Sequence, residues 1–432
     1  MSSTLRNLAL MGTSTALRLG FGMLTFVVMA RVLGPAQFGV MMLWLSVATL
    51  LSLLANYGLT PFLLREIGAA PDQAHRHMAE VLSAKLLLTS VVLLIALACL
   101  PWLNPQARAV FLLLLGAQLA DALIEFLNVG FRATNRFAAE TRIASVAAVL
   151  QCAIVTLALS WLATPLMAAA AFLLAKLAVL ALIWFAQRRY FAALRPAPLQ
   201  IAWARIRATK AYAVDFGLQS LLGQVDSIVL NHFVGPAAVG HYQAGMRLFN
   251  GGAQAASVLA NVFLPRAAAA AAASAADAGH GFRRESARVQ WAFVTVGLCF
   301  GLALCLLAEP LVLTLFGADY IDLITLMPWF GLLFFVRFFA SSWGVLLTSA
   351  GAQGFRAKSN ALQWLLIAAL ARVVVPAHGL VGWLVCLIAG NVFLSCAYVW
   401  RGRRLTSSGW WQPAFSILAL ACFLPFLQLP GG

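Results

Sequence analysis

The chain has 432 residues, of which 63% are hydrophobic and only 10% are charged. Apolar runs of about twenty residues recur along the whole length, which excludes a water-soluble globular protein and indicates a polytopic membrane protein. A net charge of +16 would suggest a nucleic-acid partner in a soluble protein, but here the distribution of basic residues between loops explains it, and we expect no nucleic-acid partner.

The apolar segments are continuous and rich in Leu, Ala and Val, which predicts helices rather than transmembrane strands. The start of the chain lacks a short apolar core with a small-residue cleavage site, so we expect the first helix to be retained. We predict an all-α integral membrane fold of 12 to 14 spanning helices, with 13 as the best count, near residues 8–31, 39–64, 79–103, 107–130, 143–163, 166–188, 211–233, 239–264, 287–316, 323–349, 359–375, 379–400 and 411–428.

Basic residues are distributed unevenly between alternate loops. If the N-terminus is cytoplasmic, most of the 29 Lys and Arg residues fall in cytoplasmic segments, whereas only Arg31 and Arg108 fall in external ones. Cytoplasmic loops of membrane proteins carry an excess of Lys and Arg. The sequence therefore predicts a cytoplasmic N-terminus.

Two short motifs reveal an internal repeat. GPAQFG at 34–39 and GPAAVG at 235–240 each separate two apolar segments, and the same offset of 201 residues relates Arg65 to Arg266. Six predicted helices separate the motifs, so both copies cross the membrane in the same direction and the repeat is parallel. We expect two parallel six-helix lobes around a central cavity, with an N-terminal lobe at 1–190, a cytoplasmic linker at 191–210, a C-terminal lobe at 211–400 and an extra helix at 401–432.

Ionisable residues inside the helices require an explanation, because a charge at membrane depth costs roughly 2.5–3.5 kcal/mol. Arg18 lies in the first helix, and we interpret Lys85 of the third helix as a lysine that reaches up to the inner surface. The fourth helix carries a polar set that suits either a functional role or packing against Lys85, Arg132 or Arg136. Its members are Gln118, Asp121, Glu125 and Asn128.

The linker and the seventh helix follow in the chain. Trp203 and Ile206 among arginines favour a linker that lies on the inner leaflet. On a regular helix, Asp215 and Asp226 would be about 20° apart and form one stripe of carboxylates, with Gln219 as the repeat counterpart of Arg18. We predict Asp215 and Asp226 as sites for a coupling proton or sodium ion; an ion pair with Arg18 that merely locks the halves together is the alternative.

The eighth helix carries a polar seam at alternating steps of four and three residues. Interhelical hydrogen bonds could account for a few such residues, but six in register favour the wall of a water-filled cavity. The seam consists of Gln243, Arg247, Asn250, Gln254, Ser257 and Asn261, and its weaker counterpart on the second helix of Met42, Ser46, Thr49, Leu53, Asn56 and Thr60. Arg337, among aromatic residues of the tenth helix, is expected to point into the same cavity. Lys176 and Arg372 are the remaining cations at membrane depth.

No enzyme signature is found. The seven cysteines lie in apolar segments, and neither they nor the six histidines have a metal-ligand spacing. The sequence has no nucleotide-binding loop and no serine-hydrolase motif. We therefore predict a protein that is not an enzyme, with no catalytic residue, metal site or cofactor apart from a coupling ion.

Two segments carry a family resemblance. LRLGFGMLTFVVMARVLGPAQFGVMMLWLSVATLLSLLANYGLTPFLLREIG at 17–68 resembles the first helix pair of the polysaccharide flippases, the O-antigen and exopolysaccharide transporters of the multidrug/oligosaccharidyl-lipid/polysaccharide exporter superfamily. VVPAHGLVGWLVCLIAGNVF at 374–393 resembles their penultimate helices, with a Pro-x-x-Gly bend. The resemblance implies a two-lobed transporter of the bacterial inner membrane that turns over undecaprenyl-pyrophosphate-linked oligosaccharide by alternating access, for cell-surface polysaccharide biosynthesis. Membrane lipids and the polysaccharide assembly machinery are the other expected partners.

A lipid-linked oligosaccharide presents an anionic pyrophosphate and a polar sugar, which match cations and an amide seam respectively. We predict pyrophosphate contacts from Arg18, Arg247 and Arg337, and further substrate contacts from Gln219, Gln243, Asn250, Gln254 and Asn261. A multidrug or cation antiporter, a lipid II-type flippase and an integral-membrane polysaccharide enzyme are the alternatives. The intramembrane cations argue against the first, and the short external loops argue against the last.

Overall fold

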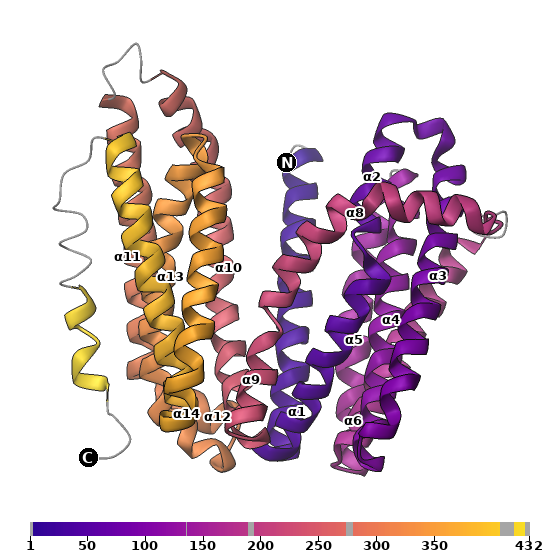
Figure 1. Cartoon of the computed structure of the whole chain (residues 1–432), viewed down its shortest axis with the longest axis horizontal. Coiled ribbons are helices and arrows are strands. Elements are labelled where there is room, and N and C mark those ends of the chain that lie inside the picture. Colours follow the sequence, from indigo (N-terminus) through magenta and orange to yellow (C-terminus); the bar gives the residue numbers. More distant parts are fainter. Residues whose placement is uncertain (1–2, 135, 189–193, 274–279, 407–418, 428–432) are drawn as a thin grey trace. The chain divides into compact units, whose positions relative to one another are not determined.

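A computed structural model describes residues 3–134, 136–188, 194–273, 280–406 and 419–427 (Figure 1), with the backbone alone described at 3–15, 211, 214–216, 218–222 and 404–406. The described residues form 13 α-helices joined by short turns and 3-10 segments. Nine helices in these ranges are long and apolar enough to cross a membrane. The predicted all-α membrane fold is confirmed.

By their contacts, the residues form two compact units, which we call the first unit (Met1–His232) and the second unit (Phe233–Gly432). The lobes expected at 1–190 and 211–400 are units of the sequence repeat, and their boundaries stay a prediction. The two units are described separately below.

The first unit is a helical bundle in which α1 packs on α4 and α5, and α6 packs on α4 and α5. Its core includes Leu63, Met78 and Phe126, all nearly inaccessible. Its helices are α1 (Ser3–Asn56), α2 (Leu59–Ala69), α3 (Ala74–Cys99), α4 (Pro105–Ala133), α5 (Phe137–Trp161), α6 (Pro165–Ala186), α8 (Leu199–Leu222) and α9 (Val225–Phe233), of which α9 ends one residue beyond the unit.

The GPA motifs are tight turns between helices. Gly34, inside α1, has φ 69°, and Gly235, just before α10, has φ 113°. A residue with a side chain would be disfavoured there by about 1–2 kcal/mol. The following proline, Pro35 or Pro236, is the first residue of the next helix, where its missing N–H costs nothing. The kink at Gly34 divides α1 into the predicted first helix and most of the second.

The region of the predicted linker and seventh helix differs from expectation. Residues of both form one helix, α8, which ends at Leu222, and α9 starts at Val225 after a turn at Gly223 and Gln224. The first part of α8 lies across the ends of α2 and α3 (Figure 1). Arg205 anchors it, because its Nε donates to Glu80 Oε2 at 2.8 Å.

The second unit is organised around α13, which packs on α10, α11 and α14. α14 bends at Gly379 (φ 55°), three residues after Pro376, where the Pro-x-x-Gly bend was expected. Of the predicted last helix, 411–428, the part before Ala419 and the final residue lie outside the described ranges. The helices are α10 (Pro236–Ala273), α11 (His280–Leu306), α12 (Ala308–Leu315), α13 (Ile321–Ser349) and α14 (Gln353–Thr406).

Candidate functional site

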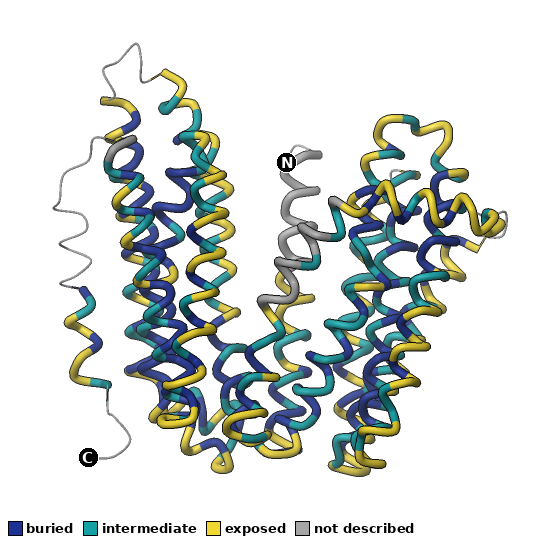
Figure 2. The backbone as a smooth tube through the Cα atoms, viewed as in Figure 1, coloured by how far each residue is buried: buried dark blue, intermediate teal, exposed yellow. Residues whose placement is uncertain are grey.

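The polar seam predicted on the eighth helix forms one open face of α10. Gln243 and Arg247 are half-buried, and the other four members, Asn250, Gln254, Ser257 and Asn261, are exposed. The opposite face packs on α13 through aromatic pairs, with Tyr242 at 6.0 Å from Phe330 and Phe249 at 5.2 Å from Phe334 between ring centroids. Figure 2 shows the resulting strip of exposed residues along α10. The periodic pattern thus separates a packed face from an accessible one.

Arg337 lies on α13, the helix against which α10 packs. The Arg337 side chain is exposed, and its guanidinium carbon is 5.6 Å from the centroid of the Phe249 ring. Phe249 directly precedes Asn250 of the seam and is two residues from Arg247. Phe249 belongs to the packed face of α10, so Arg337 contacts the helix that carries the seam, and both the Arg337 side chain and four members of the seam are exposed.

The candidates in the first unit are more dispersed. Arg18 is exposed on α1. Thr25, seven residues further along α1, is fully buried, and its hydroxyl donates to the Phe21 carbonyl at 2.8 Å. An open polar face therefore does not extend from Arg18 to Thr25. Arg372, an unassigned cation of the second unit, is also exposed.

The predicted coupling residues do not form one stripe. Asp215 is on α8 and Asp226 is in the first turn of α9, and the turn between these helices breaks the regular spacing that the prediction assumed. Asp226 is 9% exposed. The side chains of Asp215 and Gln219 lie outside those described. Whether any of the three serves transport stays a prediction.

The counterpart of the seam on the second predicted helix is largely closed. Met42, Ser46 and Thr60 are buried. The Ser46 hydroxyl donates to the Ser227 hydroxyl of α9 at 3.1 Å. The repeat thus places equivalent positions in different surroundings, since those on α10 are accessible.

A pair of lysines meets the acidic residues of α4, an arrangement that sequence reasoning left open. Lys85 is fully buried, and its ammonium donates to Asn56 Oδ1 at 2.9 Å and interacts electrostatically with Glu125. The Lys176 ammonium lies 2.5 Å from Asp121 Oδ1. The interpretation of Lys85 as a lysine that reaches the surface is wrong, because Lys85 is 0% exposed and contacts Asn56 inside the bundle. The spacing of Asp121 and Glu125, four residues apart on one helix face, was the available signal.

In the described ranges, no three His, Cys, Asp or Glu side chains lie close enough together to hold a metal ion. The side chains of the seam and of Arg337 present guanidinium, amide and hydroxyl groups. Such groups bind phosphates and sugar hydroxyls through hydrogen bonds.

Comparison with known proteins identifies relatives of the chain and of its fold. The sequence profile of a family described as "Polysaccharide biosynthesis protein" matches residues 4–271. None of the curated proteins matches the sequence significantly.

Several solved structures share the fold. An inward-facing multidrug resistance MATE family transporter of the MOP superfamily aligns with a TM-score of 0.66 and 16% identity, over 90% of this chain and 95% of that one. The lipid II flippase MurJ in an inward closed conformation aligns with a TM-score of 0.62 and 11% identity, over 96% and 98%. A variant of the Vibrio cholerae MATE transporter VcmN aligns with a TM-score of 0.55 and 16% identity, over 95% of this chain and 99% of that one. At these identities the likeness establishes the fold alone.

Proposed function

Since the chain belongs to the polysaccharide biosynthesis protein family, we propose that it flips undecaprenyl-pyrophosphate-linked oligosaccharide across the bacterial inner membrane by alternating access, for cell-surface polysaccharide biosynthesis. The chain is a multi-pass membrane protein with the fold of MATE and MurJ transporters. The substrate, the location in the bacterial inner membrane and the cytoplasmic N-terminus are the proposed parts.

One observation carries the proposal: α10 presents an exposed polar seam, and the exposed Arg337 of the adjacent helix α13 contacts α10 through Phe249. From Gln243 to Asn261 a helix rises about 27 Å, nearly the roughly 30 Å thickness of the hydrocarbon core. A sugar chain could therefore exchange hydrogen bonds with amides and hydroxyls across most of the membrane. An exposed arginine on the adjacent helix supplies the planar donor pair that a phosphate accepts.

The other predicted residues complete the proposed site. Arg18 and Arg247 would add charge for the pyrophosphate, which carries several negative charges. Asp226, and Asp215 as a second candidate, would take up a proton or sodium ion that drives the cycle. Gln219 is proposed as a further substrate contact.

The surroundings of the acidic residues argue against a multidrug or cation antiporter. Organic cations call for accessible carboxylates, whereas Asp121 is ion-paired with Lys176, and Glu125 faces Lys85. The exposed side chains of Arg18 and Arg337 would repel such substrates. A lipid II-type flippase shares the charged head group, so the choice of substrate in the assay must separate it.

The test is uptake of labelled undecaprenyl-pyrophosphate oligosaccharide by proteoliposomes containing the purified protein. We expect Arg337→Ala to reduce the initial rate about tenfold, as loss of one charge-assisted hydrogen bond predicts. Arg337→Lys should restore the rate only partly, since an ammonium cannot form the paired contact. Arg284→Ala, at an exposed arginine at the start of α11, is the matched control.

Two results would contradict the proposal. If Arg18→Ala, Arg247→Ala and Arg337→Ala combined in one protein left uptake unchanged, the proposed site would be wrong. If wild-type vesicles transported lipid II or a cationic dye but not the oligosaccharide lipid, the proposed substrate would be wrong.

A further inference from the structure

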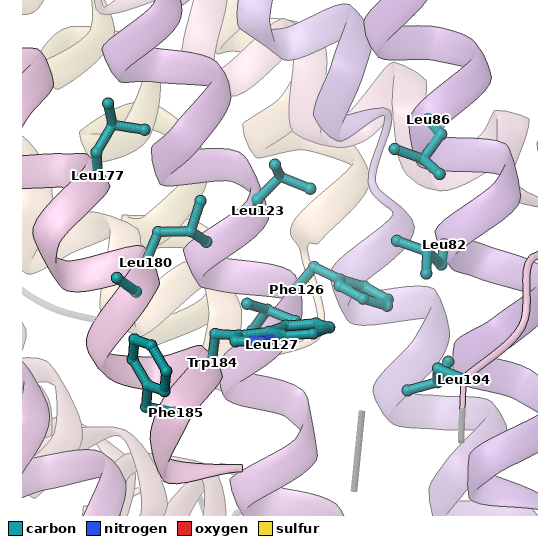
Figure 3. Close-up of a pocket in the computed structure, with 11 residues that line it drawn as sticks. Leu82, Leu86, Leu123, Phe126, Leu127, Leu177, Leu180, Trp184, Phe185 and Leu194 are labelled. Atoms are coloured by element: carbon teal, nitrogen blue, oxygen red, sulfur yellow. The ribbon is translucent and has the colours of Figure 1, made fainter. Parts of the chain in front are cut away.

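An apolar crevice opens on the surface of the first unit between α3, α4 and α6 (Figure 3). Its volume is about 520 Å³, and every residue that lines it is leucine, phenylalanine, tryptophan or alanine. Phe126 and Leu127 of α4 are almost fully buried at its floor, whereas Trp184 and Phe185 of α6 are exposed. The crevice is therefore a deep apolar surface that the protein leaves open, with the volume of a small-molecule site.

The length and position of the crevice match one leaflet of a membrane. Its lining on α6 runs from Leu177 to Phe185, a rise of about 12 Å, compared with roughly 15 Å for half of the hydrocarbon core. It lies at the end of α6 that the charge distribution assigns to the cytoplasm. A hydrocarbon chain of the inner leaflet would lie alongside it.

Two arginines mark the cytoplasmic mouth. Arg188 lies two residues beyond the end of α6 at Ala186, and Arg195 directly follows Leu194, which lines the crevice. Both arginines are exposed. The mouth thus offers two guanidinium groups at the level where the phosphate of a membrane lipid would lie.

Two other cations, on α4 and α6, are paired with carboxylates. At the opposite end of the crevice, Lys176 of α6 pairs with Asp121 of α4. On the mouth side, Arg132 of α4 pairs with Glu140 at 2.8 Å. Arg188 and Arg195 contribute positive charge at the mouth, which favours an anionic head group at that end and an uncharged chain inside.

We propose that this crevice holds the isoprenoid chain of the lipid-linked substrate as it is recruited from the inner leaflet, with its phosphate at Arg188 and Arg195. The identity of the lipid rests on the proposed function. A polyprenyl phosphate carries a single branched chain, which suits one groove lined by leucine side chains and aromatic rings, whereas a phospholipid has two chains to place. The crevice would thus collect the substrate by its tail before its sugar enters the polar seam.

The direct test uses photo-crosslinking of the full-length protein with undecaprenyl phosphate that carries a benzophenone group on its chain. We expect labelled peptides from 82–86, 123–127 and 177–185, and competition by excess undecaprenyl phosphate but not by an equal amount of phosphatidylglycerol. Label confined to other helices, or equal competition by phosphatidylglycerol, would overturn the proposal. Because this measurement needs no variant, a folding defect cannot obscure it.

Variants test the two parts separately. Ala181→Trp fills the crevice and should lower undecaprenyl phosphate binding about tenfold, and Ala153→Trp, at an exposed alanine of α5, should not. Arg188→Gln combined with Arg195→Gln should weaken binding by a similar factor, unlike Arg142→Gln at another exposed arginine. Binding equal to wild type in Ala181→Trp would refute the proposed tail site.

The two proposals fail in different ways. Undecaprenyl phosphate has no sugar, so labelled crevice peptides together with absent oligosaccharide transport would refute the proposed function and leave the lipid site. Normal transport of the oligosaccharide lipid without crevice labelling would refute the tail site alone.

Discussion

Replacement of Lys85 by methionine tests whether the buried charges of the first unit depend on one another. Lys85 is 0% exposed, donates to Asn56 and faces Glu125, which retains Arg132 as another nearby cation. Breaking a buried ion pair costs about 3–5 kcal/mol, and we expect the lower end here because Glu125 is half-buried and Arg132 remains. At about 2–4 °C per kcal/mol for a unit of this size, the unfolding midpoint should fall by about 6–12 °C.

The measurement is thermal unfolding of the purified protein in detergent. Lys358→Met removes an exposed lysine and should shift the midpoint little. Adding Glu125→Gln to Lys85→Met removes the uncompensated carboxylate and should restore at least half of the decrease in the unfolding midpoint. If Lys85→Met behaved like Lys358→Met, or if the double variant lost the sum of its single effects, the two groups would not be coupled as the structure indicates.

Two further predictions concern the backbone turn and the helix across the bundle end. Gly235→Ala should destabilise the protein by about 1–2 kcal/mol, because the φ angle of Gly235 is 113°. Gly354 also has no neighbouring atoms where a Cβ would lie, but it is helical, so Gly354→Ala should be neutral or stabilising by up to about 1 kcal/mol. Equal unfolding midpoints of the two variants would contradict this prediction. Arg205→Gln should speed amide hydrogen exchange over 199–210, because it releases α8 from Glu80. Arg207→Gln is the control and should not change the exchange, because the Arg207 guanidinium lies over the exposed Trp203 ring. Unchanged exchange in Arg205→Gln would show that other contacts hold α8.

Much of the fold could be predicted because long apolar segments must satisfy their backbone hydrogen bonds internally, which leaves helices. The GPA repeats likewise predicted equivalent connections, and both glycines have positive φ. The joining of the linker to the seventh helix was not predicted. It depends on contacts between distant segments, such as the close approach of the Tyr212 backbone to Gly58, which no local pattern records.

For the candidate site, periodicity predicted what lies on one helix and missed what lies between helices. The seam of α10 follows from spacing alone, because residues three and four apart share a face. The pairing of Lys176 with Asp121 requires knowing that α6 packs on α4. The prediction that Asp215 and Asp226 form a single stripe was wrong, because it assumed a regular helix across Gly223 and Gln224.

The polar face of α10 also bears on how the protein is made. Among the nine candidate spans of the described ranges, α10 is the least apolar. Insertion machinery admits a segment according to its summed apolar content, so this helix should be among the weakest to enter the bilayer alone. Two of its aromatic contacts, Tyr242 with Phe330 and Phe249 with Phe334, are with α13, which is synthesised later. We therefore expect α10 to settle at full depth only after α13 has emerged from the ribosome, so a chain truncated before α13 would leave α10 poorly inserted.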